Sequence, residues 1–203
     1  MSDRQALQAL FDQAIHLHQQ GDLPGAERLY QQALLLEPKS FAPRHMLGVM
    51  RFQQGRLGEA ASLIESALAL NPQVAAAWTH LGNVQNAAGR LDEAANAYGR
   101  ALALQPEDAA LMGALVTVLW NGGRHDEALA AMDRLVALRP DDIEIRHHRA
   151  NLRRERKQLD SALSDYAFVL KARPDLAETW SNRGRFCPRW AATPKRWRAW
   201  IAP

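Results

Sequence analysis

Residues 75–108 read AAAWTHLGNVQNAAGRLDEAANAYGRALALQPED, and their landmarks recur about every 34 residues, the period of a two-helix solenoid repeat. A proline ends each period, at Pro38, Pro72, Pro106, Pro140 and Pro174. Because proline cannot donate a backbone hydrogen bond and pushes its predecessor out of the α region, each of the five predicts a helix stop. About 17 residues before the next proline stand the glycines Gly21, Gly55, Gly89 and Gly123. Each period therefore predicts a first helix, a glycine turn, a second helix and a proline stop.

Small residues predict how the two helices of a period meet. The glycines fit the position just after the first helix, where φ is positive and a Cβ costs energy. Lys157 stands at this position in the fifth period, which predicts strain or a differently built turn. Alanines lie about 12 residues before each proline, and they predict a close helix crossing because a larger side chain would force the axes apart. These alanines are Ala26, Ala60, Ala94, Ala128 and Ala162.

Length and composition predict an intracellular protein, which we place in the cytoplasm. The chain has 203 residues, of which 47% are hydrophobic and 23% charged, enough for one sizeable folded domain. The first residues alternate polar and apolar at helical spacing and lack the apolar core of a signal peptide. No stretch is long and apolar enough to span a bilayer, so no membrane partner is expected. The single cysteine, Cys187, excludes an internal disulfide framework.

The charge of the chain is unevenly distributed. Residues 1–142 carry 11 Lys and Arg against 16 Asp and Glu, whereas residues 143–203 carry 14 against 6. A dense basic run comprises Arg146, Arg149, Arg153, Arg154, Arg156 and Lys157. Such a run can bind nucleic acid, but no aromatic residue is interleaved for base stacking. We therefore favour a solvated helix face, partly balanced by Glu155 and Asp160, over RNA binding.

The third period resembles the tetratricopeptide repeat (TPR). Its signature residues are Trp78, Leu81, Gly82, Gly89, Ala94, Tyr98, Ala101 and Pro106. The resemblance covers about residues 7–185 and implies an all-α fold, a right-handed α-α superhelix of five full repeats plus the first helix of a sixth. The TPR solenoid would occupy residues 1–185, with repeats at about 7–40, 41–74, 75–108, 109–142 and 143–176 and a partial one at 177–185.

Residues 186–203, FCPRWAATPKRWRAWIAP, form an irregular tail rich in Trp, Arg and Pro. Reading the gene one base earlier from this point would place a leucine at position 187, a glycine at 191 and an aspartate at 201, which restores the repeat pattern. We interpret the tail as frameshifted; the alternative is a natural basic terminus that binds a membrane surface or nucleic acid. The incomplete sixth repeat lacks a polar capping helix, which predicts a tendency to self-associate at the C-terminal end.

The sequence offers no catalytic signature. It contains no phosphate-binding glycine loop, no nucleophile elbow and no zinc-protease helix motif. His16 and His18 are two residues apart, and His147 and His148 are adjacent, so neither pair faces one ion from a helix. We therefore expect no enzymatic activity, no cofactor and no metal.

We therefore expect the function to lie on a surface. The TPR resemblance implies a concave groove that is lined by the first helix of each repeat. Amide and imidazole side chains there can bond the backbone of an extended peptide. Trp120 is also a candidate for interface core, because large rings are more often buried between helices. The candidate groove residues are His45, Thr79, Asn83, Asn86, Trp120, His147, Asn151 and Arg154.

Two functional hypotheses follow from the resemblance. The first is a scaffold without catalytic activity that binds a protein or peptide partner in the groove. The second is the N-terminal TPR arm of a bacterial glycosyltransferase or sulfotransferase, because residues 10–38, LFDQAIHLHQQGDLPGAERLYQQALLLEP, look similar to such arms.

Overall fold

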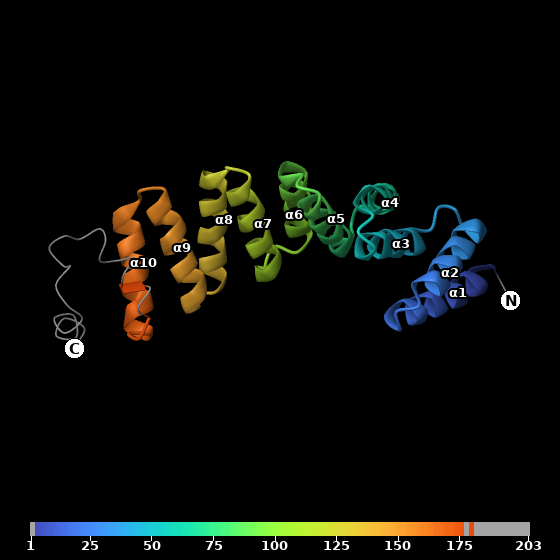
Figure 1. The fold of residues 1–203 in the computed structure, drawn as a ribbon, viewed down its shortest axis with the longest axis horizontal. Helices are drawn as coiled ribbons and strands as arrows, with labels where there is room; N and C mark the ends of the chain where they lie inside the picture. The colour runs from blue at the N-terminus through green and yellow to red at the C-terminus, as the bar shows by residue number, and fades with distance from the viewer. Residues whose placement is uncertain (1–2, 177–178, 181–203) are drawn as a thin grey trace. The chain divides into compact units, whose positions relative to one another are not determined.

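The computed structural model describes residues 3–176, 179 and 180. In this part of the chain every regular element is an α-helix, which confirms the predicted all-α solenoid (Figure 1). The helices are α1 (Asp3–Gln19), α2 (Leu23–Leu36), α3 (Phe41–Gln53), α4 (Leu57–Leu70), α5 (Ala75–Ala87), α6 (Leu91–Leu104), α7 (Ala109–Asn121), α8 (His125–Leu138), α9 (Ile143–Glu155) and α10 (Leu159–Ala172). The tail at 186–203 and the sixth-repeat helix, apart from Thr179 and Trp180, lie outside the described residues.

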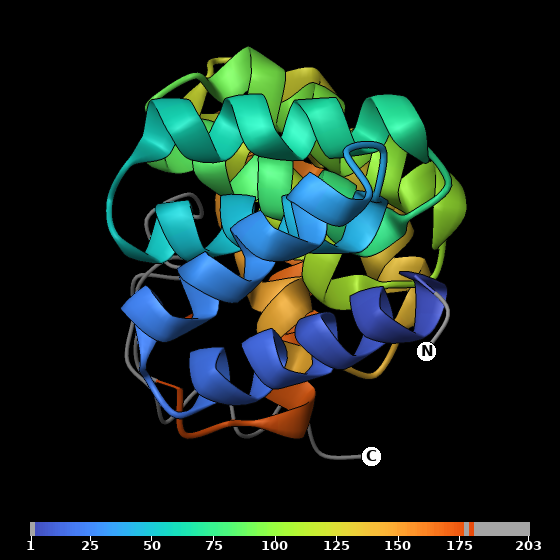
Figure 2. The same cartoon turned by 90° about the vertical axis from the view of Figure 1, so that its right-hand side faces the viewer.

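The helices fall into two compact units, an N-terminal unit (Met1–Gly122) with α1–α7 and a C-terminal unit (Gly123–Pro203) with α8–α10. In the N-terminal unit each helix packs against the next in the chain, and α3 also contacts α1 and α5. Short turns join the helices of a pair, as between α1 and α2, both blue in Figure 2. In the C-terminal unit α9 packs against α8 and α10. Hairpins stacked in sequence bury apolar faces that no single hairpin could cover.

The turns inside the helix pairs have the conformation that the glycines predicted. Gly21, Gly55, Gly89 and Gly123 have φ of 83°, 73°, 73° and 77°. At Gly55 the Arg56 N–H bonds the Arg51 carbonyl at 2.9 Å, closing the end of α3 as a left-handed residue allows. Lys157 has φ of 61° and is the only other residue with positive φ among those described. The fifth turn therefore keeps the same shape, and Lys157 bears the strain of a side chain in a left-handed conformation.

A side-chain hydrogen bond closes the junction after four of the five stop prolines. Trp78, in the first turn of α5, donates its Nε1 hydrogen to the carbonyl of Pro72 at 2.8 Å. Four residues make this bond to the stop proline six positions earlier: Arg44, Trp78, Arg146 and Trp180. Arginine therefore replaces tryptophan at this position without loss of the bond, because both carry an N–H at the end of a long side chain.

The close helix crossings also follow the prediction. Ala26, Ala60, Ala94, Ala128 and Ala162 are all between 0% and 2% exposed. Gly82 of α5 lies against Tyr98 of α6, where a Cβ would come within 2.4 Å of the tyrosine ring. Small residues thus set the distance between the helices, and large apolar residues such as Ile64 and Tyr98 fill the space between them.

No helix in the described part of the chain is long and apolar enough to cross a membrane.

Candidate partner-binding face

The eight candidate groove residues all lie on the first helices of their pairs. His45 is on α3, the run from Thr79 to Asn86 is on α5, and Trp120 is on α7, all in the N-terminal unit. His147, Asn151 and Arg154 are on α9 in the C-terminal unit. Each set is therefore considered within its own unit.

First helices of the N-terminal unit are joined by side-chain hydrogen bonds. The His18 ring, on α1, bonds Gln53 of α3 at 2.7 Å, and His45 of α3 bonds His80 of α5 at 2.9 Å. The sequence did not indicate these links, because the partners are 35 residues apart and their pairing depends on how the repeats stack. The bonds hold α1, α3 and α5 side by side.

His45 is an interior link more than a surface group. It is 7% exposed, and its ring centroid lies 5.3 Å from that of Phe41 and 5.0 Å from that of His80. Burial, reinforced by the neighbouring His80, lowers the pKa of His45 to about 4, and burial also lowers the pKa of His80. Both imidazoles are therefore neutral near pH 7, when one can donate to the other.

On α5 the structure brings Thr79, Asn83 and Asn86 to one face, since they are spaced by four and three residues. Thr79 donates to the Ala75 carbonyl at 3.1 Å, and Asn83 accepts a hydrogen bond from the Tyr98 hydroxyl at 2.7 Å. Asn86 is exposed. Among the three candidate residues of this helix, Asn86 thus carries the exposed amide.

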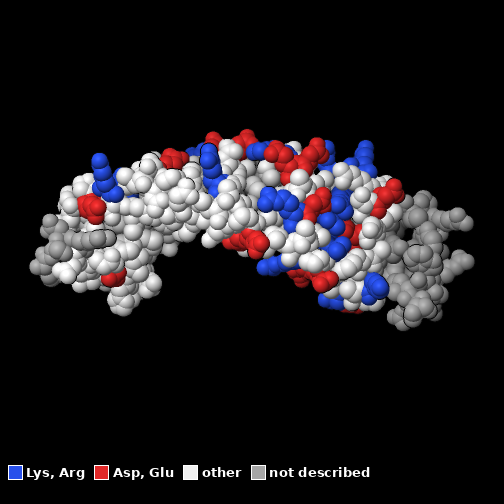
Figure 3. Space-filling model, turned by 180° about the vertical axis from the view of Figure 1, so that it is seen from behind, with Lys and Arg blue, Asp and Glu red and all other residues white. Residues whose placement is uncertain are grey.

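The first helices of the N-terminal unit carry very little charge outside α1. Neither α5 nor α7 contains Asp, Glu, Lys or Arg. The two arginines of α3 are both engaged, Arg44 by the Pro38 carbonyl and Arg51 by Glu27. On the face seen in Figure 3, charged side chains are sparse over much of the N-terminal unit and frequent, with both signs, on the C-terminal unit.

On α9, His147, Asn151 and Arg154 share a face with the same spacing. Asn151 accepts from the Tyr166 hydroxyl at 2.6 Å, and the His147 ring centroid lies 6.1 Å from that of Tyr166. All three are partly exposed. The Asn151–Tyr166 bond repeats the Asn83–Tyr98 bond two periods later.

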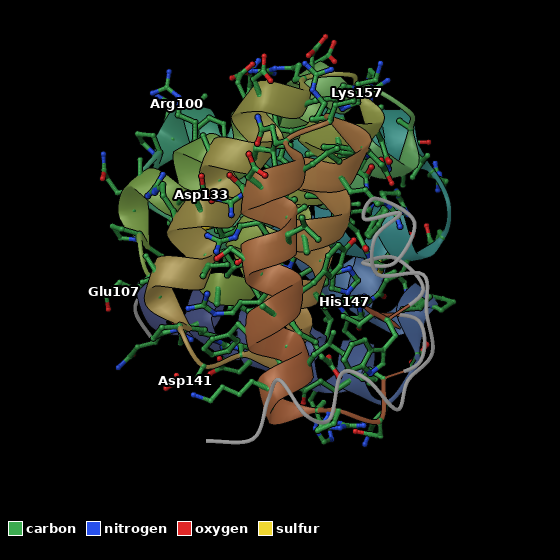
Figure 4. The ribbon with its side chains drawn as sticks, turned by 90° about the vertical axis from the view of Figure 1, so that its left-hand side faces the viewer. Arg100, Glu107, Asp133, Asp141, His147 and Lys157 are labelled. Carbon is green, nitrogen blue, oxygen red and sulfur yellow. The ribbon has the colours of Figure 1, made fainter. Side chains whose placement is uncertain are left out.

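Much of the basic run predicted as a solvated face is instead paired inside the C-terminal unit. Asp165, whose side chain is 3% exposed, accepts hydrogen bonds from Arg149 at 2.8 and 2.5 Å and from Arg153 at 2.9 Å. Asp133 accepts from the same two arginines at 3.0 and 2.7 Å. In Figure 4, Asp133 and His147 lie to opposite sides of α10.

The balancing carboxylates also differ from those the sequence suggested. Arg156 pairs with Asp126 at 3.3 Å, so Asp126, Asp133 and Asp165 take the role expected of Glu155 and Asp160. Residues 123–176 carry 11 Lys and Arg against 10 Asp and Glu. This near balance, with the pairing, weighs against a nucleic-acid site on α9.

Two shallow hollows in the N-terminal unit contain none of the candidate residues. One is lined by Leu47, Arg51, Gly58, Glu59, Ser62 and Leu63, and the other by Asp12, Gln13, His16, Leu17 and Leu29. Over residues 3–176, 179 and 180, no three His, Cys, Asp or Glu side chains are grouped as metal ligands would be.

Comparison with known proteins points to one family. Three family profiles, each described as tetratricopeptide repeat, match residues 7–32, 45–101 and 85–152, together more than half of the chain. No curated protein sequence matches the chain at a significant level.

Solved structures of several TPR-type proteins resemble the chain in fold. YrrB, described as a TPR protein with an unusual peptide-binding site, shares 19% identity with a TM-score of 0.71, covering 89% of this chain and 97% of its own. A tetratricopeptide repeat protein from Parabacteroides merdae shares 20% identity with a TM-score of 0.71, covering 90% and 73%. MamA from Desulfovibrio magneticus shares 17% identity with a TM-score of 0.69, covering 84% and 97%. At these identities the likeness concerns the fold.

Proposed function

Because the chain is a tetratricopeptide repeat protein, we propose that it is a scaffold that binds a peptide or protein partner along the first helices of its repeats. The observation that carries the proposal is the α5 face, where Asn86 is exposed and the partly exposed Asn83 uses its carbonyl oxygen to accept from Tyr98. An exposed amide offers both a donor and an acceptor, the two groups that an extended backbone needs. YrrB, of the same fold, is described as having a peptide-binding site.

The proposed site comprises the candidate residues within each unit, with different roles. We propose that Asn86, Trp120 and Arg154 contact the partner. Thr79, Asn83, His147 and Asn151 line the same faces while packing against their own units. His45 holds α3 to α5 beneath the surface.

The fold is typical of scaffolds without catalytic activity, and we propose that the whole chain has no catalytic activity. The proposed scaffold needs no cofactor and works in the cytoplasm. The frameshifted tail and the enzyme-arm alternative stay predictions, which are tested by sequencing the locus and the DNA beyond it. The assignment of residues 1–185 to one solenoid also stays a prediction.

Peptide display on the full chain tests the proposed function. A random library of peptides of about ten residues is selected against the immobilised protein, and enriched peptides are measured by calorimetry. We expect enriched peptides that lose about tenfold or more in affinity on Asn86→Ala, since an interfacial amide contributes on the order of 1.5 kcal/mol.

The matched control is Asn96→Ala, which removes an equally exposed asparagine from α6, the second helix of the same pair. It should leave binding unchanged. If no peptide is enriched, or if Asn96→Ala weakens binding as much as Asn86→Ala, the proposed function is wrong.

A further inference from the structure

Charged residues are absent from two first helices of the N-terminal unit, α5 and α7, although the unit as a whole is not poor in charge. Residues 1–122 contain 8 Lys and Arg and 11 Asp and Glu. Yet α5 and α7, each 13 residues long, contain none. The second helix α6 between them carries Asp92, Glu93 and Arg100. Within this unit the absence of charge is therefore a property of α5 and α7.

The two arginines on α3 do not break this pattern. Arg51 has a side chain only 7% exposed and bonds Glu27 and Gln54. Arg44 donates to the Pro38 carbonyl, in the turn before α3. The charge of Arg51 is therefore already paired, whereas the Arg44 guanidinium is held at the turn before α3 by a neutral carbonyl.

Equivalent positions on α3, α5 and α7 share a neutral chemistry. We call these positions the uncharged face. Its members, none of them buried, are Ala42, Val49, Phe52, Ala76, Asn83, Asn86, Ala110, Thr117 and Trp120. An alanine lies near the start of each helix. Near the end of each helix lies a larger side chain: the ring of Phe52 on α3, the amide of Asn86 on α5 and the ring of Trp120 on α7. The alanines thus allow a peptide backbone to come close to the helices, and the larger side chains offer apolar contact and hydrogen bonds to it.

From this arrangement we infer that the partner of the N-terminal unit is an extended peptide segment without charged side chains, bound across α3, α5 and α7. The inference rests on the proposed function and specifies its ligand. A charged side chain pressed on this face would lose water and find no counter-charge, so charged segments are rejected. Neutral backbone amides and small or apolar side chains find partners in Asn83, Asn86 and Phe52.

The size of the segment follows from helix spacing. Packed helices lie about 10 Å apart, so three consecutive first helices stacked side by side would span roughly 20 Å. An extended chain advances about 3.3 Å per residue, so about six to eight residues cross the face. A library of peptides of about ten residues is long enough to fill it.

The experiment repeats the peptide display with the full chain and counts charged residues in the enriched peptides. Wild-type protein should enrich peptides depleted about threefold or more in Asp, Glu, Lys and Arg relative to the starting library. Their affinity should change by less than about twofold between roughly 0.05 and 0.5 M salt, since no ion pair is screened. Asn86→Asp should shift the selection toward Lys and Arg, and Thr117→Lys toward Asp and Glu.

Asn96→Asp on α6 is the matched control and should select the same peptides as the wild type. If the wild type enriches charged peptides with salt-sensitive affinity, the inference is overturned while the proposed peptide binding stands. If Asn86→Asp and Thr117→Lys leave a neutral selection unchanged, the uncharged face is not the site and the inference is equally overturned. If no peptide is enriched by any variant, the proposed function itself fails.

Discussion

At the scale of single residues, the buried tyrosines determine which polar groups stand beside them. Tyr98 and Tyr166 each donate to an asparagine 15 positions earlier, whereas Ile64 at the equivalent position stands 15 residues after Val49. A buried hydroxyl requires a partner and an aliphatic side chain does not. The sequence contains this signal, since asparagine accompanies tyrosine in the third and fifth periods. We had predicted Asn83 and Asn151 as groove residues only, without their bonds to the tyrosines.

The His45–His80 pair predicts a pH-dependent stability. An unfolded histidine has a pKa near 6.5, and the pKa of His45 in the folded chain is about 4. Between these values the unfolded chain binds more protons, so the free energy of unfolding falls as the pH drops from about 6.5 to about 4. We expect His45→Gln, which keeps a hydrogen-bonding group but cannot titrate, to reduce this fall in urea unfolding experiments.

The control for this slope is His148→Gln, because His148 is exposed. It makes the same substitution at an imidazole outside the His45–His80 pair. Identical slopes for His45→Gln and the wild type would contradict the interpretation, whatever the absolute stabilities.

Lys157 predicts a stabilising substitution. A side chain at φ of 61° costs about 1 kcal/mol relative to glycine in a left-handed conformation. Lys157→Gly should therefore raise the free energy of unfolding of the C-terminal unit by about 0.5–1 kcal/mol, measured by hydrogen exchange. Gly89→Ala is the reverse change at a turn where an added Cβ meets nothing within 4 Å, and it should cost about 1 kcal/mol. A loss of stability in Lys157→Gly would show that the lysine side chain has a stabilising contact.

At the scale of helices, the packing of α5 on α6 depends on Gly82. A Cβ at this position would lie 2.4 Å from Tyr98, so the ring or the helix must move. We expect Gly82→Ala to lower the free energy of unfolding by about 1–3 kcal/mol in urea titrations, the range for overpacking a core. Gly99→Ala on α6 adds the same methyl where nothing lies within 4 Å, and it should stabilise by up to about 1 kcal/mol through helix propensity. Equal changes in the free energy of unfolding for the two substitutions would show that close packing at Gly82 is not the cause.

Helix positions could be predicted from the sequence because they depend on local signals. Proline stops, glycine turns and crossing alanines act within one period, so the order of the hairpins was readable from Pro72, Gly89 and Ala94 alone. The carboxylates that pair with the arginines of α9 could not be predicted from the sequence. Asp133 and Asp165 are 16 residues before and after Arg149, and only the packing of α8, α9 and α10 brings them together.

At the scale of the whole chain, a solenoid repeat contacts only its neighbours. We therefore expect the loss of stability caused by a substitution to stay local. Asp165→Asn removes the buried charge that Arg149 and Arg153 share. Losing this shared charge costs about 3 kcal/mol, because Arg149 and Arg153 then keep only the half-exposed Asp133 as a counter-charge. Hydrogen exchange should accelerate in α8–α10 and remain unchanged in α1–α4. Asp126→Asn, at a pair with an 83% exposed carboxylate, should have little effect on either.

Acceleration of exchange throughout the chain after Asp165→Asn would contradict this local response and indicate one cooperative unit.

The bond from Trp78 to the Pro72 carbonyl, repeated at three other junctions, ties the first helix of a hairpin to the stop proline six residues before it. An inserted or deleted residue within these six positions would separate donor from acceptor, whereas a copied stretch of a complete period would restore both. Over evolutionary time, we therefore expect relatives of this protein to lengthen or shorten by duplication or loss of entire hairpins and to keep the junctions constant in length.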